Sequence, residues 1–144
     1  MTSSAISVAV EASLEAALIE GLRNSEMIAA LLGQPARLFP EPPAEALFPY
    51  AVIERHQRRP HGASRVRGDE HRIDIAVYTR EGGRCEARVI LDALSRAIED
   101  LTVLIADRRV ILMHTVYSDT MRTPSRKAFR GLLRLRLLTE EIDR

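Results

Sequence analysis

The sequence predicts an α+β domain: a mostly antiparallel sheet of four to five strands with helices packed on one face, in the order ααβββαββ. Two observations carry this prediction. Apolar residues recur at helical spacing over residues 6–22 and 87–101, and they alternate with polar residues, as in strands, over residues 70–79 and 127–139. The predicted strands are clustered along the chain instead of alternating one by one with helices, which favours antiparallel pairing over parallel βαβ units.

Length and composition predict a single domain over residues 1–144, with residues 1–4 disordered. A chain of 144 residues with 46% hydrophobic content can bury one core but is short for two. Its 21 Lys and Arg against 20 Asp and Glu give a net charge of +1, so any basic surface must be local. One cysteine, no apolar run long enough to span a bilayer and no signal peptide pattern lead us to expect a soluble protein of a reducing compartment.

Two helices are predicted before the first strand and one after the third. The first ends near Arg23, and its apolar face recurs every four residues: Ile6, Val10, Leu14, Leu18 and Leu22. The second is short, with Asn24 or Ser25 as its N-cap and Gly33 at the position where a left-handed residue often ends a helix. The third follows Gly82 and Gly83, and its apolar stripe should lie on the sheet: Ala87, Ile90, Leu91, Leu94, Ala97, Ile98 and Leu101.

The remaining segments predict strands. Five prolines between residues 35 and 49 leave room only for a short edge strand over residues 37–39, and Pro49 begins a second strand through the β-branched residues Val52 and Ile53. The third strand, over residues 70–79, directs four residues toward the core: His71, Ile73, Ile75 and Val77. A fourth strand over residues 110–118 turns back through the loop around Pro124 into the last strand.

The last strand, Lys127 to Thr139, has two chemically opposite faces. Phe129, Leu133, Leu135 and Leu137 lie on one face in an extended chain, and Arg130, Arg134 and Arg136 lie on the other. A helix is the competing interpretation, because Leu and Arg both favour helices, but helical spacing would scatter the arginines among the leucines. We therefore predict a strand whose leucine face meets the helices.

Two charged surfaces are candidate interaction sites. Residues 58–69 contain Pro60, two glycines and four arginines, and they predict a mobile basic loop that either contacts phosphates or only keeps the protein soluble; the arginines are Arg58, Arg59, Arg65 and Arg67. The polar face of the sheet forms the second surface, with Glu70, Arg72, Asp74, Arg130, Arg134 and Arg136. Its arginines either meet a partner or pair with Glu70 and Asp74 across the strands.

No pattern in the sequence predicts catalysis, a metal site or a cofactor. None of the four histidines has the helical spacing of a zinc site, and His71 is expected to point into the core as a structural residue. Cys85 lies beside Arg84 and Arg88 near a helix start, which favours a thiolate, but no base can be assigned to it. We therefore expect that the chain is not an enzyme.

Several strings, in order, carry a resemblance to a known family. They are AALLGQPARLFPEPP, FPYAVIER, EHRIDIAVYTREGGRCEARVILDALSRAI, RVILMHTVYSD and FRGLLRLRLLTEE, and the resemblance covers roughly residues 14–140. In this order and spacing they resemble the small tail-completion or tail-terminator proteins of long-tailed bacteriophages and phage-like gene transfer agents.

The resemblance implies a structural assembly protein. Such proteins form a ring, usually a hexamer, that caps the head-proximal end of the tail tube and provides the surface for head-tail joining. The implied partners are other copies of the chain, the tail tube protein and a head-tail connector or neck protein, with non-specific contact to DNA in the ring lumen as a further option and no membrane. The implied location is the host cytoplasm during assembly and then the particle. Two alternatives stay open: a head-completion stopper, or a small nucleic-acid-binding regulator that uses the basic loop.

Overall fold

The computed structural model describes residues 9–45, 47–62, 67–125 and 127–142. Its elements follow the predicted order ααβββαββ: α1 Val10–Arg23, α2 Glu26–Leu32, β1 Leu38–Phe39, β2 Tyr50–His61, β3 Gly68–Thr79, α3 Gly83–Glu99, β4 Arg108–Arg122 and β5 Phe129–Glu141. The predicted disorder of residues 1–4 concerns a segment outside the described residues. Within the described part, no helix is long and apolar enough to cross a membrane.

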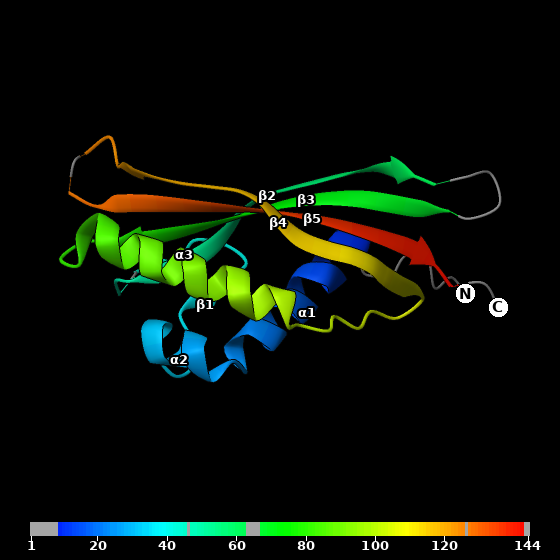
Figure 1. Ribbon diagram of the computed structural model, residues 1–144, viewed down its shortest axis with the longest axis horizontal. Coiled ribbons are helices and arrows are strands. Elements are labelled where there is room, and N and C mark those ends of the chain that lie inside the picture. Colours follow the sequence, from blue (N-terminus) through cyan, green and yellow to red (C-terminus); the bar gives the residue numbers. More distant parts are fainter. Residues whose placement is uncertain (1–8, 46, 63–66, 126, 143–144) are drawn as a thin grey trace.

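The sheet has five strands in the order β1-β2-β3-β5-β4. Three neighbouring pairs are antiparallel, and only the two-residue β1 pairs parallel with β2. All three helices lie on one side of the sheet, and the β2–β3 and β4–β5 hairpins extend toward opposite ends of the molecule (Figure 1). The predicted α+β class, with a mostly antiparallel sheet and helices on one face, is confirmed.

The helix boundaries follow local signals. The Ser25 hydroxyl accepts a hydrogen bond from the Ile28 amide at 3.4 Å, as an N-cap side chain does, and Gly33 ends α2 with a φ of 93°. α1 ends at Arg23 as predicted. α3 ends at Glu99, so Leu101 of the predicted stripe lies just beyond it and packs against the core from the following segment.

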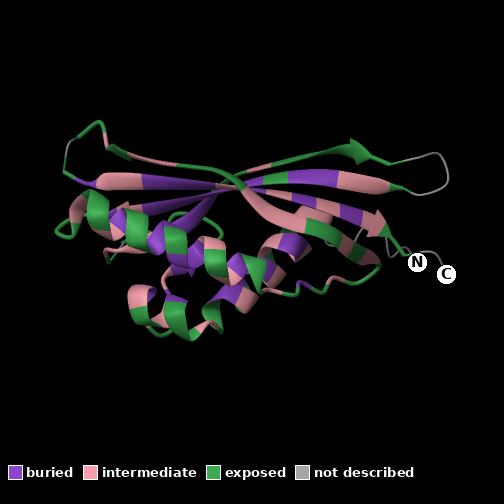
Figure 2. Cartoon of the chain, viewed as in Figure 1, coloured by how far each residue is buried: buried purple, intermediate pink, exposed green. Residues whose placement is uncertain are grey.

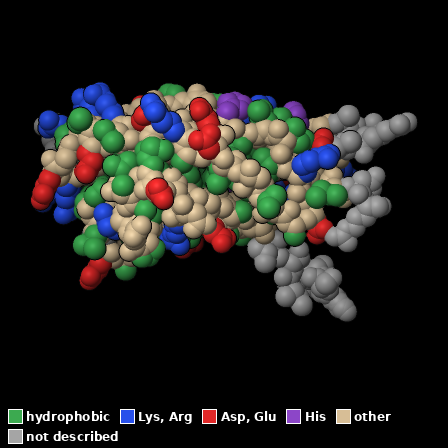
Figure 3. All heavy atoms as spheres, turned by 60° about the horizontal axis from the view of Figure 1, so that its bottom comes forward, with side chains coloured by type: hydrophobic (Ala, Val, Ile, Leu, Met, Phe, Trp, Pro, Cys, Tyr) green, Lys and Arg blue, Asp and Glu red, His purple; other side chains and the backbone are tan. Residues whose placement is uncertain are grey.

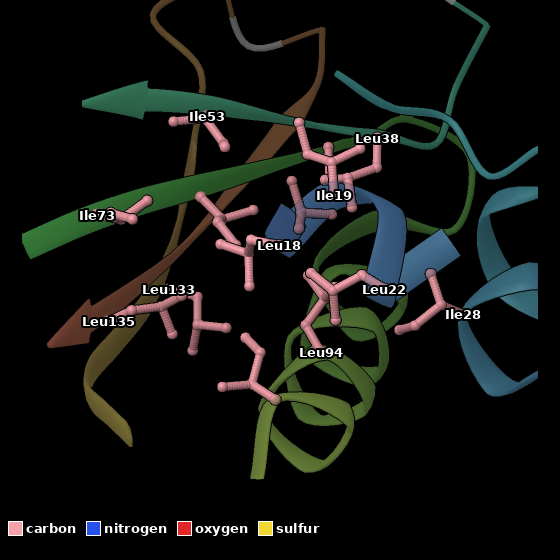
Figure 4. Packing of buried hydrophobic residues seen from close by; sticks show 14 of the residues in the cluster. Leu18, Ile19, Leu22, Ile28, Leu38, Ile53, Ile73, Leu94, Leu133 and Leu135 are labelled. Atoms are coloured by element: carbon pink, nitrogen blue, oxygen red, sulfur yellow. The ribbon is translucent and has the colours of Figure 1, made fainter. Parts of the chain in front are cut away.

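The core lies between the sheet and the helices. Leu133, Leu135 and Leu137 of β5 are buried, which confirms the strand prediction and the direction of the leucine face, although Phe129 at the start of β5 is only half-buried. They meet leucines of α1 and α3, among them Leu18 and Leu94 (Figure 4). The inward residues predicted for β3 are all fully buried: His71, Ile73, Ile75 and Val77.

The basic loop is shorter than its predicted range of residues 58–69. Arg58 to His61 continue β2, and Gly68 and Asp69 begin β3, because the two strands stay paired from Arg58↔His71 to His61↔Gly68. Pro60 is tolerated since β2 is an edge strand along this stretch, where a missing N–H removes no necessary ladder bond. The signals taken for a loop, Pro60 and the arginine run, are thus compatible with an exposed strand end. Residues 63–66, with Arg65, lie outside the described residues.

Candidate functional site

The face of the sheet that the helices leave open carries the six predicted charged residues. Side chains alternate along a strand, so the buried odd-numbered residues of β3 and β5 leave the even-numbered ones on the opposite face. The register places Asp74 across from Arg134, and Arg72 across from Arg136. The structure thereby brings together one polar surface, which we call the charged face: Glu70, Arg72, Asp74, Arg130, Arg134 and Arg136.

Two ion pairs hold the centre of the charged face. Arg134 donates two hydrogen bonds to Asp74, from Nε to Oδ1 at 2.8 Å and from Nη2 to Oδ2 at 3.0 Å, in the bidentate geometry that suits a carboxylate. Arg136 Nε donates to Glu70 Oε2 at 2.6 Å. The predicted cross-strand pairing of these two arginines is confirmed.

Glu70 lies between two guanidinium groups. Arg59 of β2 donates from Nε to Glu70 Oε1 at 2.7 Å, on the side opposite Arg136. These hydrogen bonds, that of Arg59 first, lower the pKa of Glu70 to about 2. Glu70 is therefore ionised at any physiological pH and has both oxygens engaged, so it acts as a fixed structural anion and not as a proton acceptor.

Arg130 does not pair with Glu70 or Asp74 as predicted. It pairs with Glu54 of β2, which also accepts a hydrogen bond from the Tyr78 hydroxyl. The reason is the register: Arg130 lies across from Tyr78, four residues along β3 from Asp74, a separation of ~13 Å at strand rise. Burial and the hydrogen bond to Glu54 raise the pKa of Tyr78 to about 12.

Sequence reasoning missed Glu54 because its position depends on a β-bulge. The pairing of β2 with β3 shifts between Ile53 and Arg55, so Glu54 has no partner in the register. The sequence itself carries no signal for this irregularity. With Glu54, Arg59 and Arg55, which lies across from Asp74, included, these residues number six arginines and three carboxylates, so positive charge is in excess among them.

The loop arginines that the structure describes, Arg58, Arg59 and Arg67, do not form a free basic cluster. Arg58 pairs with Glu11 at 3.1 Å and with Asp69 at 3.0 Å, and Arg59 pairs with Glu70. Arg67 is exposed, and its carbonyl accepts a hydrogen bond from the Glu141 amide at 2.8 Å. Arg65 lies outside the described residues. Two of the three described arginines are therefore neutralised within the chain.

A partly buried chain of polar side chains links α1 to the sheet. His56 Nδ1 lies 2.7 Å from Glu15 Oε2, and His56 Nε2 lies 2.8 Å from His71 Nδ1. His71 Nε2 lies 3.4 Å from Thr139 Oγ1. His71 is the buried structural histidine that the sequence predicted, and burial, followed by the neighbouring His56, lowers its pKa to about 4.

The sequence analysis did not connect these residues because only the fold brings them together. In the register of β2 and β3, His56 lies across from Ile73 and therefore diagonally from His71. Glu15 contacts His56 from α1. The described residues contain no cluster of three His, Cys, Asp or Glu side chains that could hold a metal ion. Cys85 is exposed near the start of α3.

The helix-bearing side differs from the charged face. There, acidic and basic side chains are scattered among hydrophobic ones, and the described residues show no broad basic area in this view (Figure 3).

One change tests whether the central ion pair stabilises the fold. We expect Asp74→Ala to lower the free energy of unfolding by about 1–2 kcal/mol, because Arg134 loses a charge-assisted bidentate partner but can still reach solvent. Urea unfolding would measure the loss. Arg72→Ala is the control, since Arg72 is 44% exposed and lies 3.9 Å from the nearest carboxylate, and it should change stability by less than about 0.5 kcal/mol. Equal losses from both variants would contradict a structural role for the pair.

Comparison with known proteins identifies the family. A family model described as Tail completion protein gp17 matches residues 16–140. A search of curated proteins found no match. Among solved structures, a chain of "Virion of native gene transfer agent (GTA) particle" has a TM-score of 0.82 and 23% sequence identity, and the alignment covers 93% of this chain and 99% of that chain.

The two findings carry different weight. At this level of identity the structural likeness shows a shared fold, over nearly the whole length of both chains. The family model covers most of the sequence, and its description is that of a structural component and not of an enzyme, in agreement with the absence of a catalytic prediction. The chain therefore belongs to the tail completion protein gp17 family.

Proposed function

We propose that this chain is a tail terminator. In this role, copies of the chain form a ring, of six copies by the family resemblance, on the head-proximal end of a finished tail tube in a phage or phage-like particle. The ring stops growth of the tube and presents the surface to which the head is joined. The match of residues 16–140 to the tail completion family carries the proposal.

The surfaces of the molecule suit a capping role. Capping needs extended complementary surfaces and no reacting group, and the charged face offers guanidinium groups held in place by carboxylates. Its excess of positive charge fits an acidic surface on a tail tube subunit or a neck protein. The fold shared with a chain from a gene transfer agent virion supports assembly in the host cytoplasm followed by incorporation into a particle.

The alternative in which the chain is a small nucleic-acid-binding regulator is less well supported. That role would require several free cations to contact phosphates. Arg58 and Arg59 are instead engaged with carboxylates of the same chain, and Arg67 is the loop arginine for which the described residues show no ion pair. The exposed Arg67 is compatible with a non-specific contact to DNA in a ring lumen. Tight independent binding to nucleic acid is not supported.

Deletion of the gene in a particle-producing host tests the proposal. We expect at least a roughly tenfold loss of joined head-tail particles and tails of irregular length, because the tube is not capped; re-expression of the chain should restore both. Negative-stain counts and length distributions of tails are the measurements. Tails of normal, uniform length beside unjoined heads would instead indicate the head-completion stopper role. Normal numbers of joined particles would overturn both the terminator role and the stopper role.

A further inference from the structure

We propose that the outer edge of β4 binds the next copy of this chain, by pairing antiparallel with the outer edge of that copy's β2. This inference rests on the proposed ring and names the surfaces that close it. A ring is built from heterologous contacts, in which two different surfaces of one subunit meet their counterparts on its neighbours.

β4 is a long strand with one unpaired side. It lies last in the sheet order, and among the described strands it is the longest, with 15 residues, and pairs only with β5. None of its residues is buried, so β4 lacks the purple of the neighbouring strands in Figure 2. The amide and carbonyl groups on its outer side therefore offer a template for a further strand.

The side chains of β4 are unusually apolar for an exposed edge. Half of the ten large hydrophobic residues exposed in the described part of the chain belong to this strand: Ile111, Leu112, Val116, Tyr117 and Met121. From Val110 to Ser118 the strand contains no Lys, Arg, Asp, Glu or Pro. Proteins usually protect a free edge with such residues, and their absence indicates that this edge is covered in the working state.

Two irregularities increase the apolar character of the edge. The register with β5 skips Ile111 and Val116, whose side chains are 51% and 43% exposed. A bulge changes the direction in which a side chain points, and both bulged positions here carry β-branched apolar residues. Beside the strand, a groove of about 540 Å³ between α3 and β4, lined by Leu91, Ser95 and Thr115 among others, leaves room for side chains of an added strand.

The opposite edge of the same sheet supplies the counterpart. β1 pairs only with Ala51 and Val52 of β2, so the outer side of β2 from Ile53 to Arg59 has no strand partner among the described residues, and Pro60, which lacks an N–H, ends the stretch that can pair. Successive strands from β2 through β3 and β5 to β4 are antiparallel, so β4 and β2 run in opposite directions. When neighbouring copies are related by rotation about an axis that runs along the strands, β2 of one copy is antiparallel to β4 of the next. The antiparallel order of the sheet then continues from copy to copy.

Charge disfavours the symmetric alternative, in which β4 pairs with β4 of a second copy. Full antiparallel overlap of two such strands places Arg108 of one copy opposite Arg122 of the other, at both ends of the pair. Like charges directly opposite each other on paired strands are destabilising. Against β2, the uncharged middle of β4 meets a stretch that carries Arg55, Arg58 and Arg59, so no like charges face each other there, and Arg58 and Arg59 are already paired with carboxylates.

Cross-linking tests the two edges directly. In a Cys85→Ser background, Val116→Cys marks the β4 edge and Gln57→Cys marks the β2 edge, and both side chains are exposed. We expect a short bis-maleimide to convert the purified double-cysteine protein, at high concentration, into a ladder of multimers that stops at a fixed number of copies. Each single-cysteine protein should stay monomeric, because a heterologous contact brings unlike positions together.

Lysine variants supply the matched control. Ile111→Lys places a charge on the β4 edge and should reduce ladder formation at least tenfold, whereas Met27→Lys, at a 42% exposed site on α2, should leave it unchanged. Dimers from Val116→Cys alone, or a double-cysteine protein that cross-links no more than the singles, would overturn the proposal. A ladder without a terminal size would uphold the edge contact and instead overturn the ring, so the two failures can be distinguished.

Discussion

Leu135→Ala and Leu137→Ala are each expected to lower the free energy of unfolding by about 2–5 kcal/mol. Both side chains are fully buried on β5, which has strands on both sides, and both belong to the core cluster that joins the sheet to the helices. Their removal leaves a cavity that the surrounding strands cannot easily close. Urea unfolding monitored by circular dichroism would measure the change.

Leu138→Ala is the matched control for these two variants. Leu138 has the same side chain on the same strand, but it lies on the opposite face and is only half-buried. We expect it to cost less than half of the loss caused by Leu137→Ala. If Leu138→Ala proves as destabilising as either core variant, the assignment of the two faces of β5 is wrong.

Stability should fall as the pH is lowered from about 6.5 to about 4. In the folded chain the pKa of His71 is about 4, against an ordinary value of 6.5, mainly because the imidazole is buried and secondarily because His56 is adjacent. Between these values the unfolded chain binds a proton at this residue and the folded chain does not, so acid favours unfolding by up to about 3 kcal/mol. Above pH 6.5 the residue contributes no pH dependence.

Unfolding in urea at pH 7.0 and pH 4.5 would measure this effect. His71→Gln should remove most of the difference between the two conditions, whereas His61→Gln, at an exposed histidine, should leave it intact. Glu70 does not interfere, since its lowered pKa of about 2 adds stability that is lost only in the more acidic range below its ordinary value of 4.5. Equal stability of the parent chain at the two pH values would show that His71 is not held neutral by the fold.

The sequence predicted those parts of the fold that depend on local periodicity. β3 and β5 alternate so regularly that their buried faces could be assigned residue by residue, and Ser25 and Gly33 marked the ends of α2. The charged face followed from the same alternation. The pairing of Arg134 and Arg136 was predicted, but that of Arg130 was not, because its contact with Glu54 depends on the strand register and on a bulge, which periodicity does not determine.

Long-range contacts and strand ends were the parts that sequence reasoning could not reach. The chain from Glu15 through His56 to His71 joins residues far apart in sequence, and each residue alone is unremarkable. Pro60 and the nearby arginines suggested a loop, yet an edge strand accommodates them, so β2 extends to His61. In both cases tertiary pairing outweighs the local signal.

The unprotected edge of β4 also has a consequence for the chain before assembly. A strand that is apolar from Val110 to Met113 and again at Val116, with one side unpaired among the described residues, can also pair in other registers with exposed strands of other molecules. Aggregation then competes with assembly, and the competition grows with the concentration of free subunits. We therefore expect aggregation to be least when the unassembled pool is small, that is, when synthesis of the chain matches the number of sites that consume it.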